Sequence, residues 1–124
     1  MELYKLRPWW QNLSEAQQKS VIYKLLDQLE VSNKQLRMKA ARCILYLAQG
    51  CWAEVQSDEE QREWTRTNVM LLYEAGIFPA FVELLNIEIT YVDLFSYTTL
   101  FHVSIMILNN LLTFLGTVEE LLLQ

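Results

Sequence analysis

The amino-acid sequence predicts an all-α protein of five to six helices, and three observations support this fold class. Residue pairs with the spacing of a capping box recur along the chain, and in such a box each side chain hydrogen-bonds the other's free backbone N–H at a helix start. Each of the three glycines follows an apolar run of helical period, where a C-cap is expected. No alternating apolar–polar stretch of useful length competes, apart from the short segment Ile87–Val92.

Start and stop signals delimit the expected helices. The capping-box pairs are Ser14 with Gln17, Ser32 with Gln35, Ser57 with Glu60, and Thr117 with Glu120. Gly50, Gly76 and Gly116 are expected to end helices, and Pro79 suits a first turn because its missing N–H would have no partner there. Helices are therefore expected near residues 15–31, 33–49, 58–75, 79–88 and 95–115, with a last one opening at 118.

The second of these helices has the clearest apolar face. Its apolar residues recur at helical intervals, and they are Leu36, Ala40, Cys43, Ile44 and Leu47. A separate narrow stripe on the same helix carries Gln35, Lys39, Arg42, Tyr46 and Gln49. Elsewhere, Trp64 is expected in the core, and the pair Trp9–Trp10 is expected to pack against the first helix.

Length and composition allow one helical domain over residues 1–124. Of the 124 residues, 52% are hydrophobic and 20% are charged, with 3 Gly and 2 Pro, which excludes a disordered or collagen-like protein. Two cysteines are too few for a disulfide scaffold, so we expect a reducing, cytoplasmic location. The net charge of −5 argues against nucleic acid as the main partner.

One segment is long enough to cross a membrane. Residues 94–118 contain no charged side chain, which passes the length test for a span. Polar residues interrupt the segment, including Asn109 and Asn110 well inside it, and no Lys or Arg flanks either end. A buried core helix is therefore favoured, and a membrane-associated protein anchored by residues 94–115 is the alternative.

The sequence offers no catalytic or metal-binding pattern. A single histidine, His102, gives no evidence of a catalytic triad, and a hydrogen-bonded histidine is the expected state within an apolar helix. Cys43 and Cys51 lack the spacing of zinc ligands and are expected to be free thiols. The acidic triplet at residues 58–60 complements the dipole of a helix start. We therefore expect a protein that is not an enzyme and that has no cofactor or metal.

The segment Gly76–Leu85 resembles the Gly-x-x-Pro-x-x-Val-x-Leu-Leu signature of armadillo repeats. Upstream, Tyr23–Leu29 and Ser32–Gly50 resemble the second and third helices of a preceding repeat, and Ile107–Leu111 resembles a later third helix. One full and two partial units are typical of a short solenoid. The resemblance implies an armadillo-like, right-handed solenoid, and a compact bundle of the same helices is the alternative.

Several ordered blocks together resemble the amino-terminal domain of striatin-interacting proteins. The blocks are Leu25–Val31, Arg37–Gly50, Leu71–Gly76 and Phe81–Ile89, with Trp64 and the region of Asn68 between them. This resemblance covers about residues 22–89, and no family match is found beyond Ile89. It implies a non-catalytic scaffold of the striatin-interacting phosphatase and kinase (STRIPAK) assembly, regulating signalling, cell shape and the cytoskeleton. The implied partners are striatin, protein phosphatase 2A subunits, a Mob-like protein and germinal-centre-type kinases.

The armadillo resemblance also implies where partners bind, because third helices line a concave groove in such solenoids. The candidate partner-binding residues are Lys39, Arg42, Tyr46, His102, Asn109 and Asn110. The last three accompany a stripe that also carries Thr99, Met106 and Thr113. An amide side chain suits a groove because it can both donate to and accept from a peptide backbone. An ordinary solvated face and buried, hydrogen-bonded amides are the alternatives.

The C-terminal segment carries more apolar residues than a small core can bury. Its last helix opens and stops at Gln124 before a repeat could be completed, and an uncapped repeat leaves an apolar face in water. We therefore expect a truncated terminal repeat and a contiguous exposed apolar patch formed by residues 94–124. Such a patch implies a homodimer, another partner or a further repeat.

Overall fold

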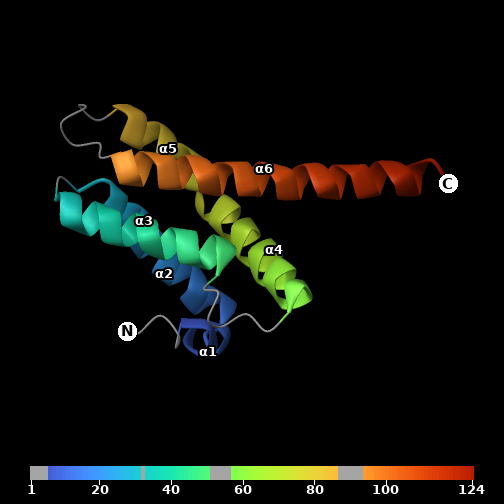
Figure 1. The fold of residues 1–124 in the computed structure, drawn as a ribbon, viewed down its shortest axis with the longest axis horizontal. Coiled ribbons are helices and arrows are strands. Elements are labelled where there is room, and N and C mark those ends of the chain that lie inside the picture. Colours follow the sequence, from blue (N-terminus) through green and yellow to red (C-terminus); the bar gives the residue numbers. More distant parts are fainter. Residues whose placement is uncertain (1–5, 32, 51–56, 87–93) are drawn as a thin grey trace.

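The computed structural model describes residues 6–31, 33–50, 57–86 and 94–124, and within them every regular element is a helix (Figure 1). The helices are α1 (Leu6–Gln11), α2 (Glu15–Leu29), α3 (Lys34–Gln49), α4 (Asp58–Ala75), α5 (Ile77–Asn86) and α6 (Leu94–Leu122). The predicted all-α fold class is confirmed. The short apolar segment Ile87–Val92 lies outside the described residues.

Two of the predicted helix starts form as expected. Ser14 caps α2 in a complete capping box, in which its side chain accepts from the N–H of Gln17 and the Gln17 side chain accepts from the N–H of Ser14. Ser57 caps α4 by accepting from the N–H of Glu60. The third start differs, because Asn33 caps α3, whereas Ser32 lies outside the described residues.

Glycines end two helices as predicted. Gly76 adopts the left-handed conformation at the end of α4, with φ 96° and ψ 38°, and its N–H donates to the carbonyls of Leu72 and Tyr73. Pro79 then lies in the first turn of α5. Gly50 ends α3 with φ 79° and ψ −178°, a combination that other residues rarely adopt.

The third predicted glycine stop is wrong. α6 continues as one helix through Gly116 to Leu122, so Thr117 does not begin a new helix. Glycine in a helix interior costs only about 1 kcal/mol relative to alanine. The segment after it contains Glu119, Glu120, Leu121 and Leu122, whose helix propensity is high enough to outweigh that cost.

The core lies between α2, α3, α4 and the first half of α6. Buried apolar residues of these helices form one cluster, to which α1 adds Trp10 and α5 adds Ile77, Ala80 and Leu84. The predicted apolar face of α3 is partly wrong. Ala40, Ile44 and Leu47 are buried, but Leu36 and Cys43 are exposed. The buried face is rotated toward residues 37, 41 and 48, because α3 packs against three neighbours, α2, α4 and α6.

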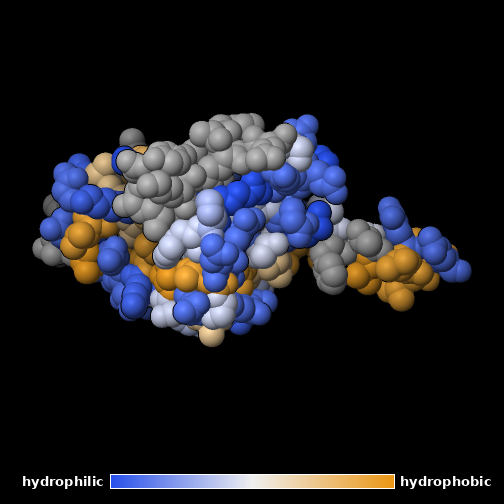
Figure 2. Space-filling view, turned by 90° about the horizontal axis from the view of Figure 1, so that it is seen from below, coloured by the Kyte–Doolittle hydropathy of each residue, from blue (hydrophilic) through white to orange (hydrophobic). Residues whose placement is uncertain are grey.

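α6 is buried on one side of its first half and exposed along its second half, so the prediction of a buried core helix is only partly right. Leu100, Val103 and Ile107 are completely buried, whereas Leu112, Leu115 and the leucines after them are exposed. Figure 1 shows this helix running past the other helices to the C-terminus, and Figure 2 shows hydrophobic residues gathered on its projecting end. α6 is also the one helix among the described residues that is long and apolar enough to cross a membrane.

Candidate functional site

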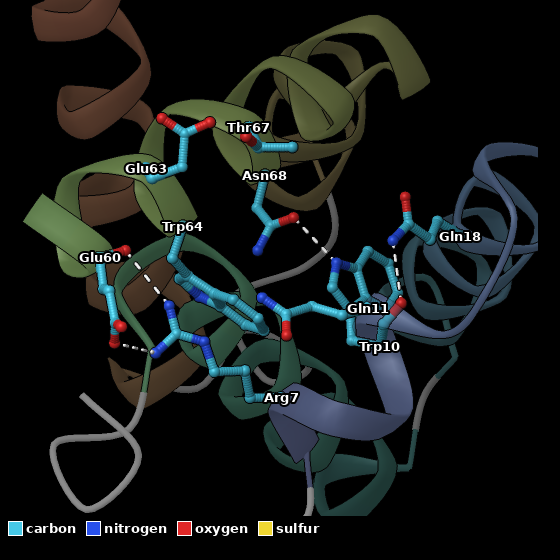
Figure 3. A pocket seen from close by; sticks show the side chains of 9 residues that line it. All are labelled: Arg7, Trp10, Gln11, Gln18, Glu60, Glu63, Trp64, Thr67 and Asn68. Carbon is cyan, nitrogen blue, oxygen red and sulfur yellow. Dashed lines mark hydrogen bonds and ion pairs between the residues drawn. The ribbon is translucent and has the colours of Figure 1, made fainter. Parts of the chain in front are cut away.

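A cavity of about 430 Å³ lies where α1 meets α2 and α4, and Figure 3 shows the side chains around it. Its lining residues are Arg7, Trp10, Gln11, Gln18, Glu60, Glu63, Trp64, Thr67 and Asn68. Three helices supply them, and the lining contains two tryptophans, three side-chain amides, two carboxylates and one guanidinium. Such a set can bind a ligand by apolar contact and hydrogen bonds. The hydroxyl of Thr67 completes the described lining, which contains no histidine, serine or cysteine.

A buried hydrogen bond fixes one wall of the cavity. The indole Nε1 of Trp10 donates to Oδ1 of Asn68 over 2.9 Å, which joins α1 to α4. Gln18 on α2 donates from Nε2 to the main-chain carbonyl of Trp10, also at 2.9 Å. Trp10 is therefore held from both neighbouring helices. The prediction that the pair Trp9–Trp10 packs against the first helix is correct for Trp10, which is buried and hydrogen-bonded to α2. It is wrong for Trp9, which is exposed.

Arg7 fixes the opposite wall. Its guanidinium lies 3.4 Å from the Glu60 carboxylate and also donates to the Glu60 carbonyl at 3.3 Å. The same group stacks over the Trp64 ring, 5.4 Å from the ring centroid. Trp64 is buried, as predicted, and its Nε1 donates to the carbonyl of Tyr46 on α3.

Asn68 leaves one donor of this site without a partner among the described residues. The side chain is only 2% exposed, and its Nδ2 makes no hydrogen bond there. In Figure 3 this nitrogen points toward the space between Trp64 and Gln11. A buried amide nitrogen in this state can donate to a carbonyl oxygen or to a water molecule.

The first predicted binding stripe lies on the outer side of α3. Lys39 and Arg42 are exposed and Tyr46 is partly buried. The Arg42 guanidinium lies over the ring of Phe95 at the start of α6, with 5.7 Å to the ring centroid. The side chains of this stripe do not line the cavity of Figure 3, and their role in partner binding stays a prediction.

The residues of the second predicted stripe, on α6, differ in how exposed they are. His102 is exposed rather than enclosed by the core, Asn109 is exposed, and Asn110 is partly buried, but Thr99 is buried. A second cavity, of about 400 Å³, lies between α4 and α6. Asn109 and Asn110 line it together with Gln61, Arg62, Thr65, Arg66, Met106 and Thr113. Their place in a cavity is compatible with the predicted role in partner binding, which stays a prediction.

The described part of the chain has no candidate metal site and few side chains with a shifted pKa. No group of three or more His, Cys, Asp or Glu residues there could hold a metal ion. Neighbouring protein atoms partly desolvate the exposed thiol of Cys43 and raise its pKa, so less of the reactive thiolate forms at neutral pH. Glu15 and Glu74 raise the pKa of Lys19, whose ammonium lies 3.3 Å and 3.7 Å from their carboxylates and connects α2 to α4.

The comparisons with known proteins match most of the chain. The profile of the N1221-like protein family matches residues 2–114. The chain belongs to this family of striatin-interacting proteins. It is 48% identical over 80 residues to striatin-interacting protein 2 and to striatin-interacting protein 1 of Homo sapiens, and equally to a striatin-interacting protein 1 homolog of Danio rerio.

The family match extends further along this chain than predicted, but it covers only a small part of each relative. The N1221-like match reaches residue 114, so the expectation of no family similarity beyond Ile89 is wrong, and the first half of α6 belongs to the family pattern. The aligned 80 residues are 64% of this chain but only 10% of each relative. The chain therefore spans about a tenth of the length of these relatives.

Sequence reasoning missed most of the Figure 3 cavity. α1 is too short to show helical periodicity, so Arg7 and Gln11 carried no signal as lining residues. Arg37, a buried cation on α3 that donates to the carbonyl of Val31 at 2.8 Å, was also not expected in the core. One usable signal existed, because Trp64 and Asn68 are four residues apart and therefore share one face of α4.

Proposed function

We propose that this chain is a non-enzymatic protein-interaction module of a striatin-interacting scaffold. The observation that carries the proposal is the exposed apolar surface on α6, which we call the α6 face and define by Phe101, Ile105, Leu108, Leu112 and Leu115. Soluble proteins rarely leave such a contiguous apolar surface without a partner. Membership of the striatin-interacting family supports an interaction role over a catalytic one.

The finer form of the proposal follows the armadillo resemblance. The helices form a short right-handed solenoid whose groove presents Lys39, Arg42 and Tyr46, extended by His102, Asn109 and Asn110. The partners proposed for it are striatin, protein phosphatase 2A subunits, a Mob-like protein and germinal-centre-type kinases. The proposed setting is the cytoplasmic STRIPAK assembly, in signalling and in the organisation of the cytoskeleton. The names of the relatives support striatin as the first partner to test.

A charge-reversal pull-down tests this proposal. The variant Lys39→Glu with Arg42→Glu removes both cations of the first stripe, and we expect it to recover at least about tenfold less striatin or phosphatase subunit than the unchanged chain. The matched control is Lys24→Glu with Lys34→Glu, which makes the same charge change at two exposed lysines outside the stripe. Equal recovery by both variants rejects the groove, and no recovery by the unchanged chain rejects the partner assignment.

Membrane association is a second candidate function, and a specific observation favours it. The segment Phe95–Leu122 is long and apolar enough to span a bilayer, and only 19% of its most apolar stretch is buried. Carbonate extraction of cell membranes separates the two candidates. Release of the chain into the supernatant is expected for the interaction module, and retention in the pellet supports an anchor.

A further inference from the structure

The α6 face has the spacing of a coiled-coil seam. Its residues follow one another at intervals of four, three, four and three, which are the intervals between the a and d positions of a heptad repeat. All five side chains are exposed, by 52% at Phe101, 40% at Ile105, 49% at Leu108, 64% at Leu112 and 59% at Leu115. A seam of this kind normally packs against a second helix.

The seam is separate from the side of α6 that holds the core. Leu100, Val103 and Ile107 pack into the core, and they are offset along the helix from the seam residues. The heptad continues past Leu115 with Glu119 and then the exposed Leu122. α6 therefore packs in the core on one side and presents a second, unoccupied apolar side over about three heptads.

We propose that a second copy of this chain occupies the seam, so that two α6 helices form an antiparallel coiled coil. The seam is self-complementary, because Leu108 and Leu112, and likewise Ile105 and Leu115, lie at equal distances on either side of residue 110. Partner choice in coiled coils is set largely by charged residues flanking the seam. The flanking positions here are His102, Ser104, Asn109, Leu111, Gly116 and Val118. None of these flanking residues is Lys, Arg, Asp or Glu, so no flanking charge selects an oppositely charged partner or repels an identical helix.

The antiparallel direction follows from the one charged seam position. In a parallel pair Glu119 would meet the same residue of the other copy, and two carboxylates in one layer repel. In an antiparallel pair centred on residue 110, Leu108 meets Leu112, Ile105 meets Leu115, and Glu119 meets Phe101 at the end of the seam. The two exposed Asn109 amides then come opposite each other near the twofold axis, where each can donate to and accept from the other.

The shape of the molecule allows this pairing. The helical body lies along the first half of α6, and the second half projects beyond it (Figure 1). In an antiparallel pair the projecting half of each helix lies along the body-bearing half of the other, so the two bodies stand at opposite ends. The exposed leucines at the projecting end, where Figure 2 shows hydrophobic residues, are then covered on the seam side.

The inference rests on the proposed function, because it names one partner of an interaction module. Light scattering coupled to size-exclusion chromatography measures the mass of the full chain in solution. We expect twice the 14.7 kDa of one chain at micromolar concentration and a return to one chain on dilution. A monomer throughout overturns the inference.

Two variants test whether the seam makes the contact. Leu108→Glu with Leu112→Glu places four carboxylates in the two central layers, and we expect the dimer dissociation constant to rise at least about 100-fold. The matched control, Leu36→Glu, makes the same exchange at an exposed leucine of α3 and should leave the mass unchanged. Helical circular dichroism of each variant confirms that the fold is retained. A dimer that survives the double variant overturns the proposal.

Cysteine cross-linking tests the direction. In a background with Cys43→Ser and Cys51→Ser, one protein carries Leu108→Cys and a second, tagged protein carries Leu112→Cys. Oxidation of the mixture should give the mixed disulfide far faster than either protein alone, because only antiparallel helices bring the two positions into one layer. Faster bonding between identical positions overturns the antiparallel direction.

Other occupants give different results in the same set of experiments. Flotation with vesicles of phosphatidylcholine and phosphatidylserine should leave the chain in the protein fraction, and co-flotation that Leu108→Glu with Leu112→Glu abolishes overturns the dimer in favour of a lipid surface. A monomer that still recovers striatin overturns the dimer and leaves the proposed function standing. A dimer that recovers no striatin or phosphatase supports the dimer and overturns the proposed partners.

Discussion

Gly50 ends α3 in a backbone conformation that costs other residues about 1–3 kcal/mol. A Cβ added there would also lie 3.2 Å from the Gln61 amide oxygen and 3.3 Å from the Trp64 ring. We expect Gly50→Ala to lower the free energy of unfolding by about 2 kcal/mol, measured by urea denaturation. Gly116→Ala is the control, because Gly116 is helical and a Cβ there meets nothing within 4 Å. It should instead stabilise the helix by up to about 1 kcal/mol, and a loss of helicity would mean that Gly116 ends α6.

The Trp10–Asn68 hydrogen bond links α1 to the core. Trp10→Phe removes the donor and leaves the Asn68 amide buried, so we expect a loss of about 1–3 kcal/mol in the free energy of unfolding. Asn68→Leu leaves the indole N–H unpaired and should cost a similar amount. The double variant should cost less than the sum of the two, because it leaves neither group unpaired. Strictly additive losses would show that this hydrogen bond contributes nothing.

Glu30 and Glu83 make stability depend on pH. A hydrogen bond and the nearby charge of Glu83 raise the pKa of Glu30 above its ordinary value of 4.5. The folded protein therefore binds a proton more tightly than the unfolded chain, and stability falls as the pH rises through that raised pKa. Glu83→Gln should stabilise the protein at pH 7 by about 0.2–1 kcal/mol, the range for exposed pairs. The gain should disappear as the pH falls through the raised pKa of Glu30, because a protonated Glu30 carries no charge for Glu83 to repel. An equal gain above and below that pKa would contradict this cause.

At the scale of elements, local signals predicted the middle of the chain best. α4 lies where its signals placed it, from Asp58 after the Ser57 cap to Ala75 before Gly76, because both of its ends use short-range hydrogen bonds that the sequence displays. α1 was not predicted, since six residues show no period and its place depends on contacts with α2 and α4. The continuation of α6 was not predicted because the glycine signal is ambiguous between a cap and a helix interior.

The two halves of α6 should differ in local stability. The segment around Leu100–Ile107 is packed in the core, whereas the last two turns have exposed side chains. In dilute, monomeric protein we expect backbone amides of residues 116–122 to exchange with solvent deuterium at least about 100-fold faster than those of residues 100–107. Hydrogen exchange followed by mass spectrometry measures this difference. Equal protection at high dilution would mean that the projecting half is stabilised within one chain.

At the scale of the whole molecule, the fold class and the family could be predicted, but the cavity at α1 could not. Fold class depends on periodicity and capping, which are local. The cavity depends on side chains that are far apart in sequence, such as Arg7 with Glu60 and Trp10 with Asn68. The exposed apolar surface could be predicted from composition alone. Residues 94–118 contain more apolar side chains than the neighbouring helices can bury.

The attachment of α1 also has a consequence for the order of folding. Its contacts with α4 join residues 58 positions apart for Trp10 with Asn68 and 53 apart for Arg7 with Glu60. Contacts that close long loops cost more chain entropy than those between neighbouring helices. We expect these contacts to form after the transition state, so that Trp10→Phe mainly speeds unfolding and leaves the refolding rate nearly unchanged. Stopped-flow circular dichroism measures both rates, and a slower refolding rate would place α1 in the folding nucleus.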